Sequence, residues 1–133
     1  MNIEATSMAD APEPAALELS TPNPVVEATT RTAEESGFAA FDGTRLFYRY
    51  WQASTAQTEA TQRAFVFIHR GHEHSGRVQM LVERLCGPQD AAFAWDARGH
   101  GHSPGERGDA PDFKTMVNDL EAFARHLQTK HSI

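Results

Sequence analysis

Two short segments carry the residues whose types and spacing could do chemistry. The first, residues 69–77 (HRGHEHSGR), follows a run of four apolar residues, 65–68 (FVFI), which predicts a strand buried on both faces. A polar segment between a buried strand and a helix is where open α/β sheets bind their ligands. Backbone N–H groups close to a helix N-terminus could also stabilise a developing oxyanion. We expect Gly71 to supply such an N–H, because glycine permits close approach of its backbone.

The second segment, residues 97–108 (ARGHGHSPGERG), contains the pattern G-x-S-x-G, which can present a nucleophilic serine. That arrangement needs a strand directly before the pattern and a helix directly after it, whereas several loop residues separate Trp95 from Ser103 here. Pro104 also lacks the N–H that the residue after a nucleophile donates to the oxyanion. We therefore interpret the segment as a glycine-rich turn that keeps the loop compact, in which Ser103 is not a nucleophile.

A nucleotide site is a weaker interpretation of the same glycines. Gly99, Gly101 and Gly105 are spaced G-x-G-x-x-x-G, whereas the dinucleotide-binding pattern is G-x-G-x-x-G. No helix is expected directly after them, so the phosphate-binding end of a helix is missing.

Histidines in both segments raise the alternative of a zinc site, since imidazole and carboxylate groups are good zinc ligands. Their spacing matches no zinc signature, and neighbouring residues aim poorly at one point. We favour a polar loop whose histidines bond to backbone or water, and we expect neither a metal nor a cofactor. The residues concerned are His69, His72, Glu73, His74, His100 and His102.

The elements that must position these segments follow from the periodicity of apolar residues. Residues 38–51 (FAAFDGTRLFYRYW) predict a β-hairpin with Asp42-Gly43 as its two-residue turn. Residues 92–95 (AFAW) predict a second short buried strand. The order of hairpin, strand, helix, strand and helix predicts an α/β fold, with parallel strands joined by right-handed crossovers.

Two helices are expected between and after these strands. Residues 76–86 predict the first, with Ser75 as its N-cap and Gly87 at its C-terminal cap. The second begins after Asp112, which can cap it, and ends near residue 128. Its apolar stripe is expected to consist of Phe113, Met116, Val117, Leu120, Phe123 and Leu127.

Composition excludes some classes of function. The 133 residues carry a net charge of -6, which argues against nucleic acid or an anionic membrane as the main partner. No apolar run approaches the ~18 residues of a membrane span and no secretory signal is visible, so we expect a cytoplasmic location. The single cysteine, Cys86, is expected to be a buried structural thiol. Residues 1–36, rich in Ala, Thr, Pro and Glu, predict a disordered acidic tail before a folded domain at 37–133.

Together the motifs resemble those of a known family. The run HRGHEHSGR, followed by a helix and then WDARGHGHSPGERG, is similar to the lysophospholipase and monoacylglycerol-lipase branch of the α/β-hydrolases, described broadly as a serine aminopeptidase-like domain. In that branch an HGxGEHSGR-type loop follows the third strand, and a D-x-R-G-H-G-x-S-x-G loop follows the fourth. The likeness covers about residues 37–129 and includes FDGTRLFYRYW, which resembles the first hairpin of the family.

By position, the resemblance makes Gly71 the donor of an oxyanion N–H and His69 a support for its loop. It implies that Glu73, His74, Ser75 and Gly76 shape the rim of a pocket whose binding residues are His69, Arg70, His72, Glu73 and His74. The second motif is structural in the family, and its serine is not the nucleophile. Here that motif falls on Asp96, Arg98, Gly99, His100, Gly101, Ser103 and Gly105. The family's His-Gly dipeptide is His69-Arg70 in this chain, so a side chain stands where the family has none.

The family's nucleophile lies after the fifth strand, with the acid and the catalytic histidine later still. All three are therefore expected beyond Ile133. The resemblance implies the amino-terminal portion of a serine hydrolase acting on lipophilic esters such as monoacylglycerols or lysophospholipids, inactive as these 133 residues alone. The strand at 65–68 would then be an open apolar edge that could pair with a missing carboxyl-terminal half or a partner chain. Two alternatives stay open: a non-catalytic module that pairs through this edge, and a metal binder that uses the loop histidines.

Overall fold

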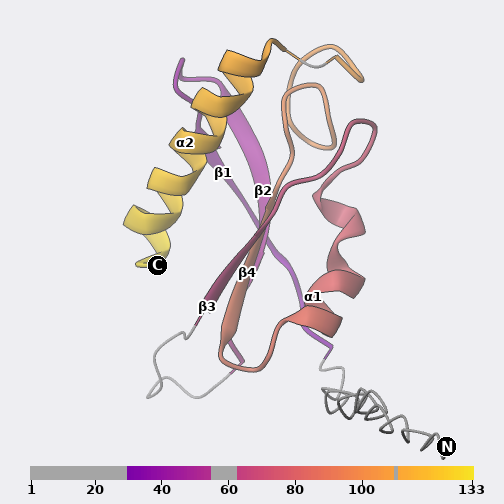
Figure 1. Cartoon of the computed structure of the whole chain (residues 1–133), viewed down its shortest axis with the longest axis vertical. Helices are drawn as coiled ribbons and strands as arrows, with labels where there is room; N and C mark the ends of the chain where they lie inside the picture. The colour runs from indigo at the N-terminus through magenta and orange to yellow at the C-terminus, as the bar shows by residue number, and fades with distance from the viewer. Residues whose placement is uncertain (1–29, 55–62, 110) are drawn as a thin grey trace, which may run out of the picture.

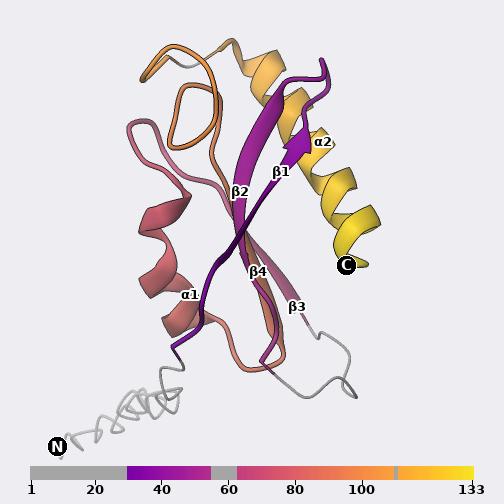
Figure 2. The ribbon, with the colours of Figure 1, turned by 180° about the vertical axis from the view of Figure 1, so that it is seen from behind.

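The described part of the chain folds as a four-stranded sheet between helices. The computed structural model describes residues 30–54, 63–109 and 111–133, and the structural statements that follow refer to them. The strands β1 (Glu34–Ala39), β2 (Arg45–Trp51), β3 (Arg63–Phe67) and β4 (Asp90–Trp95) lie in the order β1-β2-β4-β3. Pairing is antiparallel from β1 to β2 and from β2 to β4, and parallel between β4 and β3. Helix α1 (Gln79–Leu85) and helix α2 (Phe113–His131) lie on opposite faces of the sheet (Figures 1 and 2). The predicted α/β class is confirmed.

The predicted hairpin is confirmed as β1 and β2. Ala40 N–H donates to Thr44 O at 2.8 Å, and Gly43 N–H donates to Ala40 O at 3.0 Å. Gly43 has φ +85, a conformation that glycine adopts at little cost. The Asp42 side chain accepts from Thr44 N–H at 3.0 Å, which fixes the turn further.

Two apolar clusters hold the helices to the sheet. The cluster under α2 includes Leu46 and Tyr48 of β2 with Phe123 and Leu127 of the helix. The cluster under α1 includes Trp51, which lies on the opposite face of β2. Every residue of β4 is buried, because β4 has a neighbour on each edge and a helix on each face. The predicted second buried strand is therefore confirmed.

The strand predicted at residues 65–68 forms as β3, but the prediction that it is buried on both faces is wrong. Strand β3 lies at the edge of the four-stranded sheet, where Val66 is 44% exposed and the following Ile68 is 54% exposed. Phe65 and Phe67 are half-buried against the α1 cluster. An apolar run shows that residues favour burial, but burial also requires a neighbouring strand and cover on both faces.

The first predicted helix is shorter than expected and begins differently. A 3₁₀ turn, η1 (Ser75–Arg77), precedes α1. Ser75 is not the N-cap, because it is the first residue of η1; His74 caps η1, and its Nδ1 accepts from Gly76 N–H at 3.2 Å. Cys86, in extended backbone, ends α1 in place of Gly87, and its thiol is buried as expected.

Helix α2 begins at the predicted cap. The Asp112 side chain accepts from Thr115 N–H at 3.0 Å. The expected apolar stripe is only partly covered, since Phe123 and Leu127 are buried against the sheet while the residues of the first turns are not. Phe113, Met116 and Val117 are 80%, 37% and 44% exposed. No helix in the described segments is long and apolar enough to cross a membrane.

The predicted boundary at residue 36 falls inside a strand. Strand β1 begins at Glu34, and Arg31 is buried, with its Nη2 donating to Trp51 O at 3.1 Å and to Asp90 O at 2.7 Å. The fold therefore includes residues from at least Arg31. The rest of the predicted tail, residues 1–29, lies outside the described residues.

Candidate functional site

Both segments with candidate chemistry lie at the same end of the sheet. The first loop, residues 68–74, follows β3, and the second loop, residues 96–109, follows β4 (Figures 1 and 2). The carboxyl ends of neighbouring parallel strands meet at one edge of a sheet, which explains this placement. A ligand at this end could touch both loops.

Gly71 lies at the exposed turn of the first loop. Within the described part of the chain, its N–H has no hydrogen-bond acceptor, whereas the nearby Glu73 N–H donates to Arg70 O at 3.3 Å. A Cβ added at Gly71 would meet nothing within 4 Å, so the backbone is open to approach. His72, the next residue, has φ +64, which turns the chain sharply after Gly71. Gly71 therefore presents an unpaired donor at the surface.

His69 connects the beginning of the first loop to the second loop. Its Nε2 accepts from Ala97 N–H at 3.0 Å, so the proton of the neutral ring lies on Nδ1. Nδ1 then donates to Arg70 O at 2.7 Å, directly before Gly71. The ring centroid of His100 lies 5.0 Å from that of His69. This imidazole fixes the carbonyl that precedes the exposed amide.

Asp96 connects the end of the first loop to the second. Its carboxylate is fully buried; Oδ1 accepts from Ser75 N–H at 2.6 Å and Oδ2 accepts from His102 N–H at 2.8 Å. Ser75 Oγ in turn accepts from Arg49 Nη1 at 2.9 Å. The first loop is therefore held at both ends. Between those ends, the exposed residues are Arg70, Gly71, His72, Glu73 and His74.

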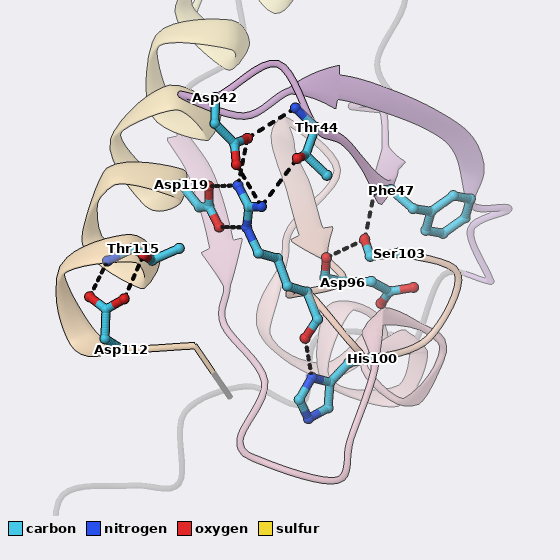
Figure 3. A network of polar contacts seen from close by, with 10 residues as sticks. Asp42, Thr44, Phe47, Asp96, His100, Ser103, Asp112, Thr115 and Asp119 are labelled. Atoms are coloured by element: carbon cyan, nitrogen blue, oxygen red, sulfur yellow. Dashed lines mark hydrogen bonds and ion pairs between the residues drawn. The ribbon is translucent and has the colours of Figure 1, made fainter. Parts of the chain in front are cut away.

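Ser103, the serine of the G-x-S-x-G pattern, is only 1% exposed. Its Oγ accepts from Phe47 N–H at 2.9 Å and donates to Asp96 O, as Figure 3 shows. The hydroxyl proton and one lone pair are both used inside the protein, and no solvent-facing side is left for a substrate. The Ser103 hydroxyl therefore links β2 to the second loop by hydrogen bonds.

Arg98 ties the second loop to the hairpin turn and to α2 (Figure 3). Its guanidinium donates to both oxygens of Asp119, at 2.6 and 2.8 Å, and to both oxygens of Asp42, at 2.9 and 2.8 Å. Hydrogen bonds from Arg98 and Thr44 hold the pKa of Asp42 well below its usual range. The hydrogen bonds to Asp119, and to a smaller extent those to Asp42, raise the pKa of Arg98. Sequence reasoning missed both carboxylates. Asp119 gave a signal, because it lies beside the predicted apolar stripe of α2 and a buried carboxylate requires a cation.

Glycine is required at two positions of the second loop. A Cβ on Gly101, which has φ +50, would lie 2.0 Å from Asp96 Oδ2. A Cβ on Gly99, which has φ +73, would lie 2.3 Å from Glu106 O. Gly105 and His100 complete the turn: Gly105 has φ +121, and His100 Nδ1 bonds to Arg98 O at 2.8 Å. The second loop is compact because its backbone crosses itself closely.

A metal site and a groove are the two other kinds of site to compare with the exposed amide. In residues 30–54, 63–109 and 111–133, no three His, Cys, Asp or Glu side chains are grouped so that they could hold a metal ion. A groove of about 490 Å³ lies on the hairpin, between Arg45, Phe47 and His102, and Gly71 does not line it. Gly71 is exposed, and its amide lies at the surface of the described part of the chain, away from that groove.

Comparison with known proteins is consistent across sequence and structure. Residues 59–133 match the family model described as serine aminopeptidase, S33. The uncharacterized protein YnbC of Escherichia coli strain K12 is 46% identical over 72% of this chain and 16% of its own length. Human monoglyceride lipase is 41% identical over 65% of this chain and 27% of its own length. A soluble variant of monoglyceride lipase from Saccharomyces cerevisiae, solved with a substrate analogue, is similar with a TM-score of 0.58 and 25% identity, covering 83% of this chain and 35% of that one. The chain thus spans 16% and 27% of the lengths of these two curated relatives.

Proposed function

The chain belongs to the serine aminopeptidase S33 family of α/β-hydrolases, and from that premise we propose that it supplies the oxyanion loop of a carboxylic ester hydrolase of the monoglyceride lipase type. The observation that carries the proposal is the unpaired N–H of Gly71, held at the carboxyl end of the sheet within the described residues. The named activity of the human and yeast relatives supports a lipophilic ester as substrate.

In this proposal the chemistry is acyl transfer through a serine ester. Attack on the ester carbonyl places negative charge on its oxygen, and the Gly71 N–H donates a hydrogen bond to that oxygen. His69 and Asp96 act as positioning residues, because they fix the two ends of the loop without reaching the substrate. A donor that is already oriented stabilises the oxyanion without reorganising during the reaction.

The nucleophile, acid and base are expected from residues outside these 133. Ser103 is unsuited to the role of nucleophile because its hydroxyl is buried and bonded on both sides. The purified chain is therefore expected to show no turnover of a p-nitrophenyl ester above the rate in buffer. Turnover that Ser103→Ala abolishes would contradict both the inactivity and the structural role of Ser103. DNA downstream that encodes a strand followed by G-x-S-x-G would identify the source of the missing groups.

A second candidate, pairing through the sheet edge, rests on the exposure of β3. Within the described residues, Val66 and Ile68 are 44% and 54% exposed, beside strand backbone that pairs with β4 alone. Such an edge can accept a further strand by backbone hydrogen bonding. Co-purification with a polypeptide bearing G-x-S-x-G would support this role, and a stable monomer at high concentration would count against it. Charged substitution Val66→Lys is the matched control, since it should abolish pairing while leaving the fold intact.

A further inference from the structure

One phenol and two imidazoles meet under the last turns of α2, far in sequence from either loop. Tyr48 Oη lies 3.0 Å from His126 Nε2 and 3.0 Å from His131 Nε2. Tyr48 is fully buried, and both imidazoles are half-buried. A phenol has a single proton, so it donates to one imidazole and accepts from the N–H of the other. This pairing satisfies all three groups only while at least one imidazole is neutral.

The same imidazoles cover aromatic surface of the sheet. The ring centroid of His131 lies 4.8 Å from that of Tyr50 and 4.9 Å from that of Phe93. The ring of His126 lies 5.8 Å from that of Phe38. Detachment of residues 126–131 would therefore expose aromatic side chains of β1, β2 and β4 to water.

The charged groups around the cluster are mostly positive. Lys130 on α2 lies with its Nζ 5.8 Å from the centre of the Tyr48 ring, and it also bonds to Ser36 Oγ at 2.7 Å. Arg45 on β2 interacts electrostatically with His126, and Glu34 on β1 interacts electrostatically with His131. Burial lowers the pKa of both histidines most, and the positive charge of Lys130 is the second cause. His131 and Arg45 lower the pKa of His126 further, whereas Glu34 acts to raise the pKa of His131. The Glu34 carboxylate also accepts from Tyr50 Oη at 2.6 Å.

We propose that the end of α2, residues 126–131, is an acid-released clasp, held to the sheet by two neutral imidazoles that share the hydroxyl of Tyr48. When both rings are protonated, each Nε2–H can still donate to the phenol oxygen, but the phenol proton has lost its acceptor. Two new positive charges then lie beside Lys130 and Arg45 in a half-buried site. The clasp opens and exposes the aromatic surface under it.

The direction of the pH effect follows from proton binding. The detached turn binds protons more readily than the attached one, because the pKa of each histidine is lower in the attached state. Attachment is therefore fully favourable above the ordinary histidine pKa of about 6.5 and is lost as pH falls below it.

Amide hydrogen exchange of the whole chain tests the clasp. Protection of the peptide spanning residues 126–131, corrected for intrinsic exchange, is measured from about pH 7.5 to about pH 5, a range that brackets the ordinary histidine pKa. As the pH falls, we expect a severalfold loss of protection confined to this peptide. The loss should be absent in the double variant His126→Gln and His131→Gln, because a glutamine side chain can form hydrogen bonds but does not titrate in this pH range. His102→Gln, which changes an exposed histidine of the second loop, is the control and should behave as the parent chain.

Two further measurements decide the case if the double variant does not fold. Tyr48→Phe removes the shared hydroxyl, and its loss of protection should occur at higher pH than in the parent chain. The imidazole resonances of His126 and His131 should titrate below those of exposed histidines and together with the loss of protection. Unchanged protection over the pH range, the same acid loss in the double variant, or ordinary titration of both imidazoles would overturn the proposal.

Discussion

The first loop, residues 68–74, and the second loop, residues 96–109, lie at the same end of the sheet and use their polar groups in opposite ways. In the second loop, Ser103, Arg98 and the Asp96 carboxylate are buried or bonded on several sides within the protein. In the first loop, only the ends are bonded, and the exposed turn at Gly71 has a backbone N–H without an acceptor among the described residues. The second loop holds the two ends of the first loop in position, through Ala97 and Asp96.

This difference shows that a motif locates chemistry only when its polar groups remain available. The G-x-S-x-G pattern of the second loop contains a serine whose proton and lone pair are already used. The first loop contains no nucleophile pattern, but its Gly71 N–H is free to donate a hydrogen bond to an oxyanion.

Arg98→Ala should destabilise the fold most. It leaves Asp119, whose side chain is 2% exposed, as a buried carboxylate without its cation. Loss of one partner from a buried ion pair typically costs about 3 to 5 kcal/mol. The urea midpoint of unfolding measures the change. Arg125→Ala, which removes an exposed ion pair with Glu121 on the same helix, is the control and should change little. Equal effects of the two variants would show that the second loop is no special support.

Alanine at a glycine of each loop gives a matched pair. Gly101→Ala places a Cβ 2.0 Å from Asp96 Oδ2 at φ +50, so we expect a loss of about 3 kcal/mol from the disfavoured conformation and the overlap. Gly71→Ala meets nothing within 4 Å, and we expect a change within about 0.5 kcal/mol. Both are measured by urea unfolding. A destabilising Gly71→Ala would mean that the first loop is packed as tightly as the second.

Ser103→Ala should cost about 2 kcal/mol, because it leaves the Phe47 N–H and the Asp96 carbonyl without a partner in the interior. Ser54→Ala, which removes an exposed hydroxyl bonded to Pro88 O at 3.3 Å, should be nearly neutral. Thermal or urea unfolding distinguishes them. A neutral Ser103→Ala would remove the bridging role assigned to this hydroxyl.

Acid should weaken the second loop through Asp42. Its pKa is lower in the folded chain, so its contribution to stability is present above the unfolded value of about 3.9 and is lost as pH falls below that value. Asp42→Asn should therefore reduce the fall in melting temperature between about pH 5 and about pH 3, where the carboxylate titrates in the unfolded chain. An unchanged acid dependence in this variant would show that the Arg98 contact with Asp42 contributes nothing.

Local signals predicted the elements whose causes are local. Asp42-Gly43 specified the hairpin turn and Asp112 the start of α2, because each acts on backbone within a few residues. Burial of β3 could not be read from its apolar run, since it depends on which neighbours pair with it and which faces are covered.

The support of the candidate site was also beyond local signals. The pairing of Arg98 with Asp42 and Asp119 joins three elements that are distant in the sequence. The resemblance to a family implies that Asp96 and Arg98 are structural, but their partners depend on how distant segments pack in the fold. The availability of Gly71 depends on the absence of an acceptor nearby, and spacing alone does not predict that.

Amide hydrogen exchange at single residues tests the contrast between the loops most directly. Gly71 N–H should exchange close to its intrinsic rate, because it has no acceptor among the described residues. Gly99 N–H, which donates to Pro104 O at 2.8 Å in a buried turn, should exchange far more slowly. Protection of Gly71 equal to that of Gly99 would contradict the account, since the amide proposed for the oxyanion would already be bonded within the protein.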